Sequence, residues 1–179
     1  NLVGSETIIL SGSGVIGNKN VADSVALTNV SGLSLGDGSN GGLASNYTLS
    51  GGTHTVNVTK RPITISGSKN YDGSTTVQNS SISTISNRAG GETLNLNGSG
   101  TVDSAAVGTN KEISLGSLSL ADNSGLASNY ELSSGSFDVN VRDVTFVGTR
   151  HYDGTTDANT SNFTSTFSNL VSGENLNLT

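Results

Sequence analysis

The feature that most constrains this chain is a hexapeptide that occurs twice. Gly-Leu-Ala-Ser-Asn-Tyr occupies positions 42–47 and again positions 125–130, 83 residues further on. A period of this length is too long for a solenoid coil or a propeller blade, and it fits a small independent β domain. Other pieces return at nearly the same distance: Tyr-Asp-Gly at 71–73 and 152–154, Val-Asn-Val at 56–58 and 139–141, and Glu-x-Leu-Asn-Leu at 92–96 and 174–178.

Apolar alternation predicts strands whose faces invert at two places. Phe137, Val139 and Val141 alternate in one phase, whereas Val144 and Phe146 alternate in the other. A second inversion falls at the only proline, at position 62. Since a one-residue slip turns a strand's side chains to the opposite face, we place module junctions at these points. The sequence therefore predicts a module lacking its first strands at 1–60, a complete module at 61–142 and the start of a third at 143–179.

Composition favours strands and turns over helices. Hydrophobic residues make up 32% and aromatic residues 4% of the chain, so the core must be thin and aliphatic. Glycine, serine, threonine and asparagine are poor helix formers, while Thr and Val suit strands and Gly, Asn and Asp suit turns. We expect an all-β fold of tandem modules arranged end to end as a rod. Each module is either an immunoglobulin-like sandwich or a more open, β-grasp-like sheet, and the sequence leaves both open.

Charge and cysteine content exclude several partners. With 14 acidic and 8 basic residues and a pI near 4.6, the chain lacks the basic surface that binds nucleic acids and anionic membranes. No apolar run approaches the roughly 18 residues of a membrane helix. Absence of cysteine excludes disulfides and thiolate metal sites, and suits an exposed extracellular protein. No signal peptide is present, so we expect a segment of a longer or processed chain.

The repeated Tyr-Asp-Gly is expected to be a structural turn. Asp-Gly is a favoured turn dipeptide because Gly adopts positive φ freely and Asp caps its own turn. The tyrosine would lay its ring on the core and bond backbone through its hydroxyl. Calcium binding is the alternative for the two aspartates, but each is solitary and calcium requires six to eight oxygen ligands. The residues concerned are Tyr71, Asp72, Gly73, Tyr152, Asp153 and Gly154.

The Gly-Leu-Ala-Ser-Asn-Tyr motif is expected to be a surface corner repeated once per module. Asn46 and Asn129 would supply a side-chain cap, and Tyr47 and Tyr130 would each start the next strand. A glycan-binding Tyr-Asn pair is the alternative function.

No candidate for catalysis recurs with the modules. His54 aligns with Phe137 and His151 with Asn70, so neither histidine belongs to the repeat. The sequence contains no nucleophile elbow, no HExxH and no P-loop. We expect Glu6, Glu92 and Glu174, which do recur, to have turn roles at strand entrances. The prediction is a protein without enzymatic activity or cofactor, calcium being the one alternative.

Together these motifs resemble YDG repeats. Lys69 to Thr75 reads K-x-Y-D-G-S-T and is followed by G-E-x-L-x-L, V-G-T-N-K at 107–111, L-x-L-x-D at 118–122, G-L-A-S-N-Y and V-N-V. The first unit departs from this pattern, with a longer 15–35 segment. Such repeats, and the related MBG repeats, occur in tandem in large bacterial surface exoproteins of the filamentous-haemagglutinin type, typically exported by two-partner secretion. The resemblance implies an extracellular, outer-membrane-associated adhesin or biofilm-matrix stalk and transfers no binding residue.

Three functions remain open at this stage. The first is a structural stalk whose partners are neighbouring repeats of the same polypeptide. The second is a repeated carbohydrate-binding module for matrix polysaccharide, which requires exposed aromatic platforms. The third is a self-assembling extracellular fibre in which like chains complete the split module. None involves nucleic acid or direct membrane insertion.

Overall fold

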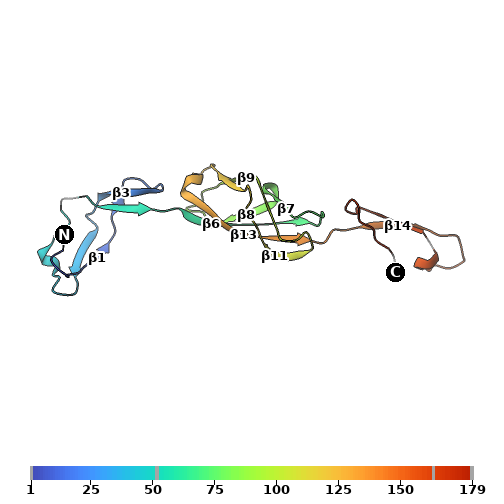
Figure 1. Cartoon of the computed structure of the whole chain (residues 1–179), viewed down its shortest axis with the longest axis horizontal. Helices are drawn as coiled ribbons and strands as arrows, with labels where there is room; N and C mark the ends of the chain where they lie inside the picture. The colour runs from blue at the N-terminus through green and yellow to red at the C-terminus, as the bar shows by residue number, and fades with distance from the viewer. Residues whose placement is uncertain (1, 51–52, 163, 178–179) are drawn as a thin grey trace. The chain divides into compact units, whose positions relative to one another are not determined.

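The computed structural model describes residues 2–50, 53–162 and 164–177. It is mostly β, with several small sheets and four single-turn 3-10 helices among the described residues (Figure 1). The all-β expectation is thereby confirmed at this level. Leu178, which ends the second Glu-x-Leu-Asn-Leu copy, lies outside the described residues. Within those same ranges, no helix has the length and apolarity needed to cross a membrane.

A four-stranded sheet organises the middle of the chain. Its strand order is β11-β13-β6-β8, so strands far apart in sequence are neighbours. Two smaller pairs, β7 with β10 and β9 with β12, complete this region. The strands are β6 (Arg61–Asn70), β7 (Thr76–Gln78), β8 (Ile82–Ser86), β9 (Asn95–Asn97), β10 (Ser99–Thr101), β11 (Gly108–Glu112), β12 (Ser119–Ala121) and β13 (Tyr130–Asn140).

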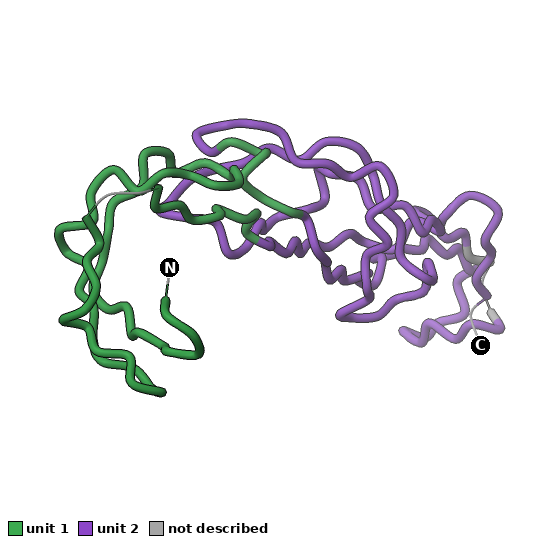
Figure 2. Tube along the Cα trace, turned by 60° about the vertical axis from the view of Figure 1, so that its left-hand side comes forward, with its two compact units in different colours: residues 1–61, 126–131 green, residues 62–125, 132–179 purple. Residues whose placement is uncertain are grey.

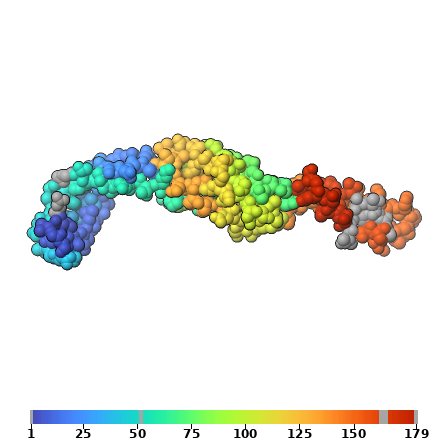
Figure 3. Space-filling view, viewed as in Figure 1, coloured from blue at the N-terminus to red at the C-terminus, as the bar shows by residue number. Residues whose placement is uncertain are grey.

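The hydrophobic core lies on one face of this sheet. Ile63, Ile65, Phe137 and Val139 are at most 2% exposed and alternate with polar residues along β6 and β13, as half-buried strands require. Val141 does not continue the series: β13 ends at Asn140, and Val141 is 69% exposed. The atoms of this region form a continuous surface, green to yellow in the space-filling view (Figure 3).

Residues 2–60 form two separate sheets with little buried apolar surface. One pairs β1 (Ile8–Gly12) with β4 (Leu33–Asp37), and the other has the order β2-β3-β5. Among the described residues of this range, Val25 is the single buried hydrophobic side chain. The bounds of the second sheet are β2 (Val15–Ile16), β3 (Ala22–Asn29) and β5 (Thr55–Val58).

Residues 143–177 contain one hairpin, β14 (Thr145–Thr149) with β15 (Thr164–Ser168). Thr145 pairs with Ser168 as Thr64 pairs with Ser86 in the β6–β8 hairpin. Across the strands, the ring centroids of Phe146 and Phe167 are 6.0 Å apart, within the range of aromatic pairs. This hairpin therefore repeats the opening hairpin of the preceding module.

The chain divides into two compact units, residues 1–61 with 126–131 and residues 62–125 with 132–179 (Figure 2). In the first unit the side chain of Asn129 joins residues distant in sequence. Its Oδ1 accepts the N–H of Val21 at 2.9 Å, and its Nδ2 donates to Oδ1 of Asn20 at 3.0 Å. The side chain of Asn129 thus has its polar partners more than 100 residues earlier in the chain.

The exposure difference between two valines gives a matched test of this core. We expect Val139→Ala to lower the free energy of unfolding by roughly 2 kcal/mol, because it removes two buried methyl groups and leaves a cavity. Val141→Ala, two residues along the chain and largely exposed, is expected to change it by less than about 0.5 kcal/mol. Urea unfolding measures both; equal effects would contradict the assignment of the core.

Candidate functional site

The Tyr-Asp-Gly turn at 71–73 is held by its own side chains. Oδ1 of Asp72 accepts the N–H of Ser74 at 2.9 Å, the pattern of an Asx turn, and Gly73 has φ +76°. Lys69 Nζ lies 2.8 Å from the Asp72 carboxylate and donates to the carbonyls of Ser74 and Thr76 at 2.7 and 2.8 Å. One lysine therefore neutralises the aspartate and satisfies two turn carbonyls.

The second copy repeats this arrangement with arginine in place of lysine. Asp153 Oδ1 accepts the N–H of Thr155 at 2.9 Å, and Gly154 has φ +76°. Arg150 Nη1 lies 2.5 Å from Asp153, and its Nη2 donates to the carbonyl of Thr155 at 2.7 Å. Both turns thus use the basic residue three positions before the aspartate.

Both aspartates have lowered pKa values. For Asp72, burial acts to raise the pKa, but hydrogen bonds from Lys69 and from the Ser74 N–H outweigh it and bring the pKa below the ordinary 3.8. For Asp153, the Thr155 N–H is the largest cause of the lowering, followed by Arg150. The carboxylates are therefore charged at neutral pH and already paired with a cation.

The geometry offers calcium few ligands at either turn. Within the parts of the chain that the structure describes, no three His, Asp or Glu side chains gather as a metal site. Because calcium requires six to eight oxygens, Asp72 and Asp153 would each have to recruit most ligands from backbone and water. That calcium does not bind here stays a prediction.

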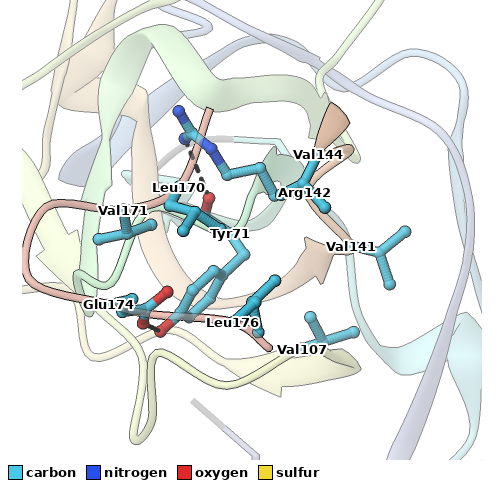
Figure 4. A pocket seen from close by; sticks show the side chains of 9 residues that line it. All are labelled: Tyr71, Val107, Val141, Arg142, Val144, Leu170, Val171, Glu174 and Leu176. Atoms are coloured by element: carbon cyan, nitrogen blue, oxygen red, sulfur yellow. Dashed lines mark hydrogen bonds between the residues drawn. The ribbon is translucent and has the colours of Figure 1, made fainter. Parts of the chain in front are cut away.

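The Tyr71 side chain connects the complete module to the segment that follows it. Its ring packs against the core, and its hydroxyl donates a hydrogen bond to Oε1 of Glu174 (Figure 4). The expectation of a backbone partner for this hydroxyl was wrong, because a carboxylate more than 100 residues away reaches it. Tyr152 differs again: it is 95% exposed.

Arg142 connects the same two parts through two backbone carbonyls and one side-chain amide oxygen. Its Nε donates to the carbonyl of Asn169 at 2.7 Å and its Nη2 to Oδ1 of the same residue at 2.7 Å. Its Nη1 donates to the carbonyl of Tyr71 at 3.3 Å. A rigid guanidinium fork suits this task, since three donors are held in one plane.

An asparagine at the end of each opening hairpin was missed by sequence reasoning. Asn169 and Asn87 both have φ +63°, and their Nδ2 atoms donate at 2.7 Å to the carbonyls of Asp143 and Pro62. Each therefore ties the end of a hairpin back to its start. The signal was present, because each asparagine lies five residues before a recurring glutamate, Glu92 or Glu174, and Asn tolerates positive φ better than most residues.

A small apolar pocket of about 260 Å³ marks this junction (Figure 4). It lies between the complete module and the segment after Leu170, and a Cβ on Gly73 would come within 2.9 Å of the Val171 side chain. The site can therefore hold two parts of the chain together. Apolar side chains around Tyr71 come from Val107, Val141, Val144, Leu170, Val171 and Leu176.

The Gly-Leu-Ala-Ser-Asn-Tyr motif forms the 3-10 turns η1 (Ala44–Asn46) and η3 (Ala127–Asn129). Tyr130 begins β13 and is 4% exposed, so this copy is more than a surface corner. No strand begins at Tyr47, and the expectation of one was wrong there. The side-chain cap expected of the asparagines was wrong. Neither η1 nor η3 has a side-chain hydrogen bond at its N-cap, and the side chain of Asn129 bonds distant residues instead.

Tyr47 has a carboxylate partner of the same kind as Tyr71. Its hydroxyl donates to Oε2 of Glu6 and accepts the N–H of Val3 at 3.2 Å. For both tyrosines the hydrogen bond to glutamate is the largest cause that raises the phenol pKa above 10.0. Turn roles were expected for the recurring glutamates. The side chains of Glu6 and Glu174 in addition accept hydrogen bonds from tyrosine hydroxyls.

Comparison with known families identifies one part of the chain. Residues 55–137 match the YDG domain. The matched residues contain the Tyr71–Gly73 turn, the 3-10 turn η3, and all four strands of the main sheet in whole or part, so the match covers most of the buried face of that sheet. The predicted YDG resemblance is confirmed for these residues. Neither the curated proteins nor the solved structures give a match.

The Tyr71–Glu174 hydrogen bond is testable by tyrosinate absorbance. We expect Glu174→Gln to lower the pKa of Tyr71 toward 10.0, because the acceptor loses its charge. Since the folded pKa is raised, the bond contributes stability below about pH 10 and loses it as pH rises through the folded pKa. The part of the absorbance change that Tyr71→Phe removes is the titration of Tyr71. If Glu174→Gln left that titration unchanged, the contact would be contradicted.

The Asp72 turn predicts a loss of stability in acid. A lowered pKa means that the ionised carboxylate stabilises the fold above its unfolded pKa and that this contribution disappears as pH falls through the folded value. We expect Asp72→Asn to cost at most about 1 kcal/mol at neutral pH, because the partly exposed ion pair is screened. This cost should vanish well below pH 3.8. Asp157→Asn, an exposed matched control, should show no such dependence.

Proposed function

We propose that this chain consists of structural stalk repeats of a bacterial cell-surface or biofilm-matrix adhesin. On this proposal the repeats are extracellular, belong to a tandem array of a two-partner-secreted, haemagglutinin-like exoprotein, and project a binding region from the cell. Their direct partners are neighbouring repeats of the same polypeptide. They have no catalytic activity, require no cofactor, and bind neither nucleic acid nor membrane.

The observation that carries the proposal is the set of bonds made by Arg142. This residue follows β13, and its three hydrogen bonds join the YDG turn to the end of the next hairpin. In a flexible linker, the guanidinium N–H groups would form hydrogen bonds with water instead. Hydrogen bonds across a junction restrict bending between successive modules. A stalk that projects a binding region from the cell requires this stiffness.

Further support comes from the chemistry that recurs. Asp72 and Asp153 bond their own turns, and Asn87 and Asn169 tie hairpin ends. These repeated polar side chains therefore form their hydrogen bonds with backbone groups of the same chain. A repeated receptor site would instead present unpaired polar or aromatic groups to solvent.

The carbohydrate-binding alternative depends on exposed aromatic rings. Tyr130 is 4% exposed, and the hydroxyls of Tyr47 and Tyr71 bond glutamates. Tyr152 alone among the tyrosines is almost completely exposed, which gives a single ring where a glycan platform needs several. The stalk is therefore the better supported function.

Residual dipolar couplings measured on the 179-residue chain test the stalk. We expect residues 62–140 and 143–177 to share one alignment tensor, and we expect Arg142→Ala to give them separate tensors because the junction loses three hydrogen bonds. Arg88→Ala, an exposed arginine in the same unit, is the charge-matched control. Independent tensors in the unaltered chain, or micromolar binding of a matrix polysaccharide, would overturn the proposal.

A further inference from the structure

The second copy of the hexapeptide belongs to the YDG domain in sequence and to the first compact unit in space. Residues 126–131 lie within the 55–137 match, yet they group with residues 1–61 (Figure 2). Strand β13 runs without a break from Tyr130 to Asn140, although its residues from Leu132 onward group with the other unit. The η3 turn is therefore the place where one repeat becomes part of the preceding one.

The backbone of this turn is satisfied without the asparagine side chain. The N–H of Asn129 donates to the carbonyl of Leu126 at 3.0 Å, and in the first copy the N–H of Asn46 donates to the carbonyl of Leu43 at 3.0 Å. Neither turn has a side-chain hydrogen bond at its N-cap. The hexapeptide thus fixes the asparagine backbone in the same way twice and leaves the side-chain amide for another partner.

The partner of the Asn129 amide is the bend that precedes β3. Oδ1 of Asn18 accepts the N–H of Asn20 at 3.0 Å, which is the pattern of an Asx turn. Asn129 then bonds two consecutive residues of this bend, the side chain of Asn20 at 3.0 Å and the N–H of Val21 at 2.9 Å. Both contacts are partly buried, so water replaces them less easily than it would on an open surface.

Asparagine suits this position chemically. Its amide carries one acceptor oxygen and one donor nitrogen in the same plane. Because the Val21 N–H is a donor, the amide oxygen of Asn129 must face it, and the amide nitrogen is then directed at Oδ1 of Asn20. An aspartate would supply acceptors alone, and a serine would supply a single hydroxyl.

We propose that the Gly-Leu-Ala-Ser-Asn-Tyr turn is a recognition element through which one repeat binds the preceding repeat, and that Asn129 determines its specificity. The surface that it recognises is the Asn-Lys-Asn-Val bend at 18–21, through one amide oxygen and one backbone N–H. This inference rests on the stalk function and deepens it, because it names a surface by which neighbouring repeats are held. It also gives the hexapeptide a role other than a surface corner or a glycan site.

Amide hydrogen exchange, measured by NMR on the 179-residue chain, tests the proposal. We expect Asn129→Ala to speed the exchange of the Val21 amide by about fivefold, the factor expected for the net loss of one hydrogen bond. Asn46→Ala makes the same change in the first copy of the hexapeptide and should leave Val21 unchanged. Amides of β6 and β8 should also keep their rates, which separates loss of the contact from unfolding of the YDG domain.

Aspartates at both positions give a second test that does not depend on truncating a side chain. In Asn20→Asp or Asn129→Asp alone, the remaining asparagine can turn its amide to donate to the new carboxylate. The double variant places two carboxylates where atoms 3.0 Å apart now bond, with no donor between them. We expect Val21 exchange in the double variant to exceed the product of the two single effects by roughly fivefold.

Three results would overturn the proposal. The first is Val21 exchange that Asn129→Ala leaves unchanged, and the second is equal acceleration at Val21 and in β6 and β8. The third is exchange in the double variant no faster than the product of the single effects. The Arg142 experiment concerns a different set of bonds, so a shared alignment tensor for residues 62–140 and 143–177 would then leave the stalk function standing and remove this inference alone.

Discussion

The pairing of β6 with β13 is the interaction on which the rest of the YDG domain depends. It joins strands about 70 residues apart and brings Ile63, Ile65, Phe137 and Val139 onto one buried face. Where this pairing is absent, the same sequence pattern gives shorter strands and exposed valine and phenylalanine side chains. The local residues differ as well, since Phe146 stands for Ile65 and His54 for Phe137, but apolar alternation is kept in both places.

A core this thin gives polar contacts an unusually large part in defining the fold. Burial of a few aliphatic side chains and one phenylalanine must offset the ordering of many glycine and serine residues. Turns that close themselves, such as Asp72 with Ser74, reduce the number of conformations the apolar contacts have to select among. The asparagines at 87 and 169 act similarly at hairpin ends, where positive φ would otherwise be costly.

Whether a feature could be predicted from the sequence depends on how far apart in the sequence the interacting residues lie. The Asp-Gly turns and the strand phases depend on neighbours in sequence, so they were readable there. The carboxylate partner of Tyr71 and the partners of Asn129 lie about 100 residues away, and nothing in the local pattern specifies them. The strand expected at Tyr47 failed for a related reason, since strand formation there depends on a neighbour that the hexapeptide does not contain.

The recurring glutamate shows how one residue can serve two modules. Glu6 accepts the Tyr47 hydroxyl of its own module through Oε2, whereas Glu174 accepts the Tyr71 hydroxyl of the preceding module through Oε1. A carboxylate has two oxygens with about four lone-pair sites, so both contacts are compatible on one side chain. Asparagine or glutamine would offer a single acceptor oxygen and no charge. The recurring position therefore has a chemical reason to be glutamate, because its carboxylate accepts a tyrosine hydroxyl within a module at Glu6 and across a junction at Glu174.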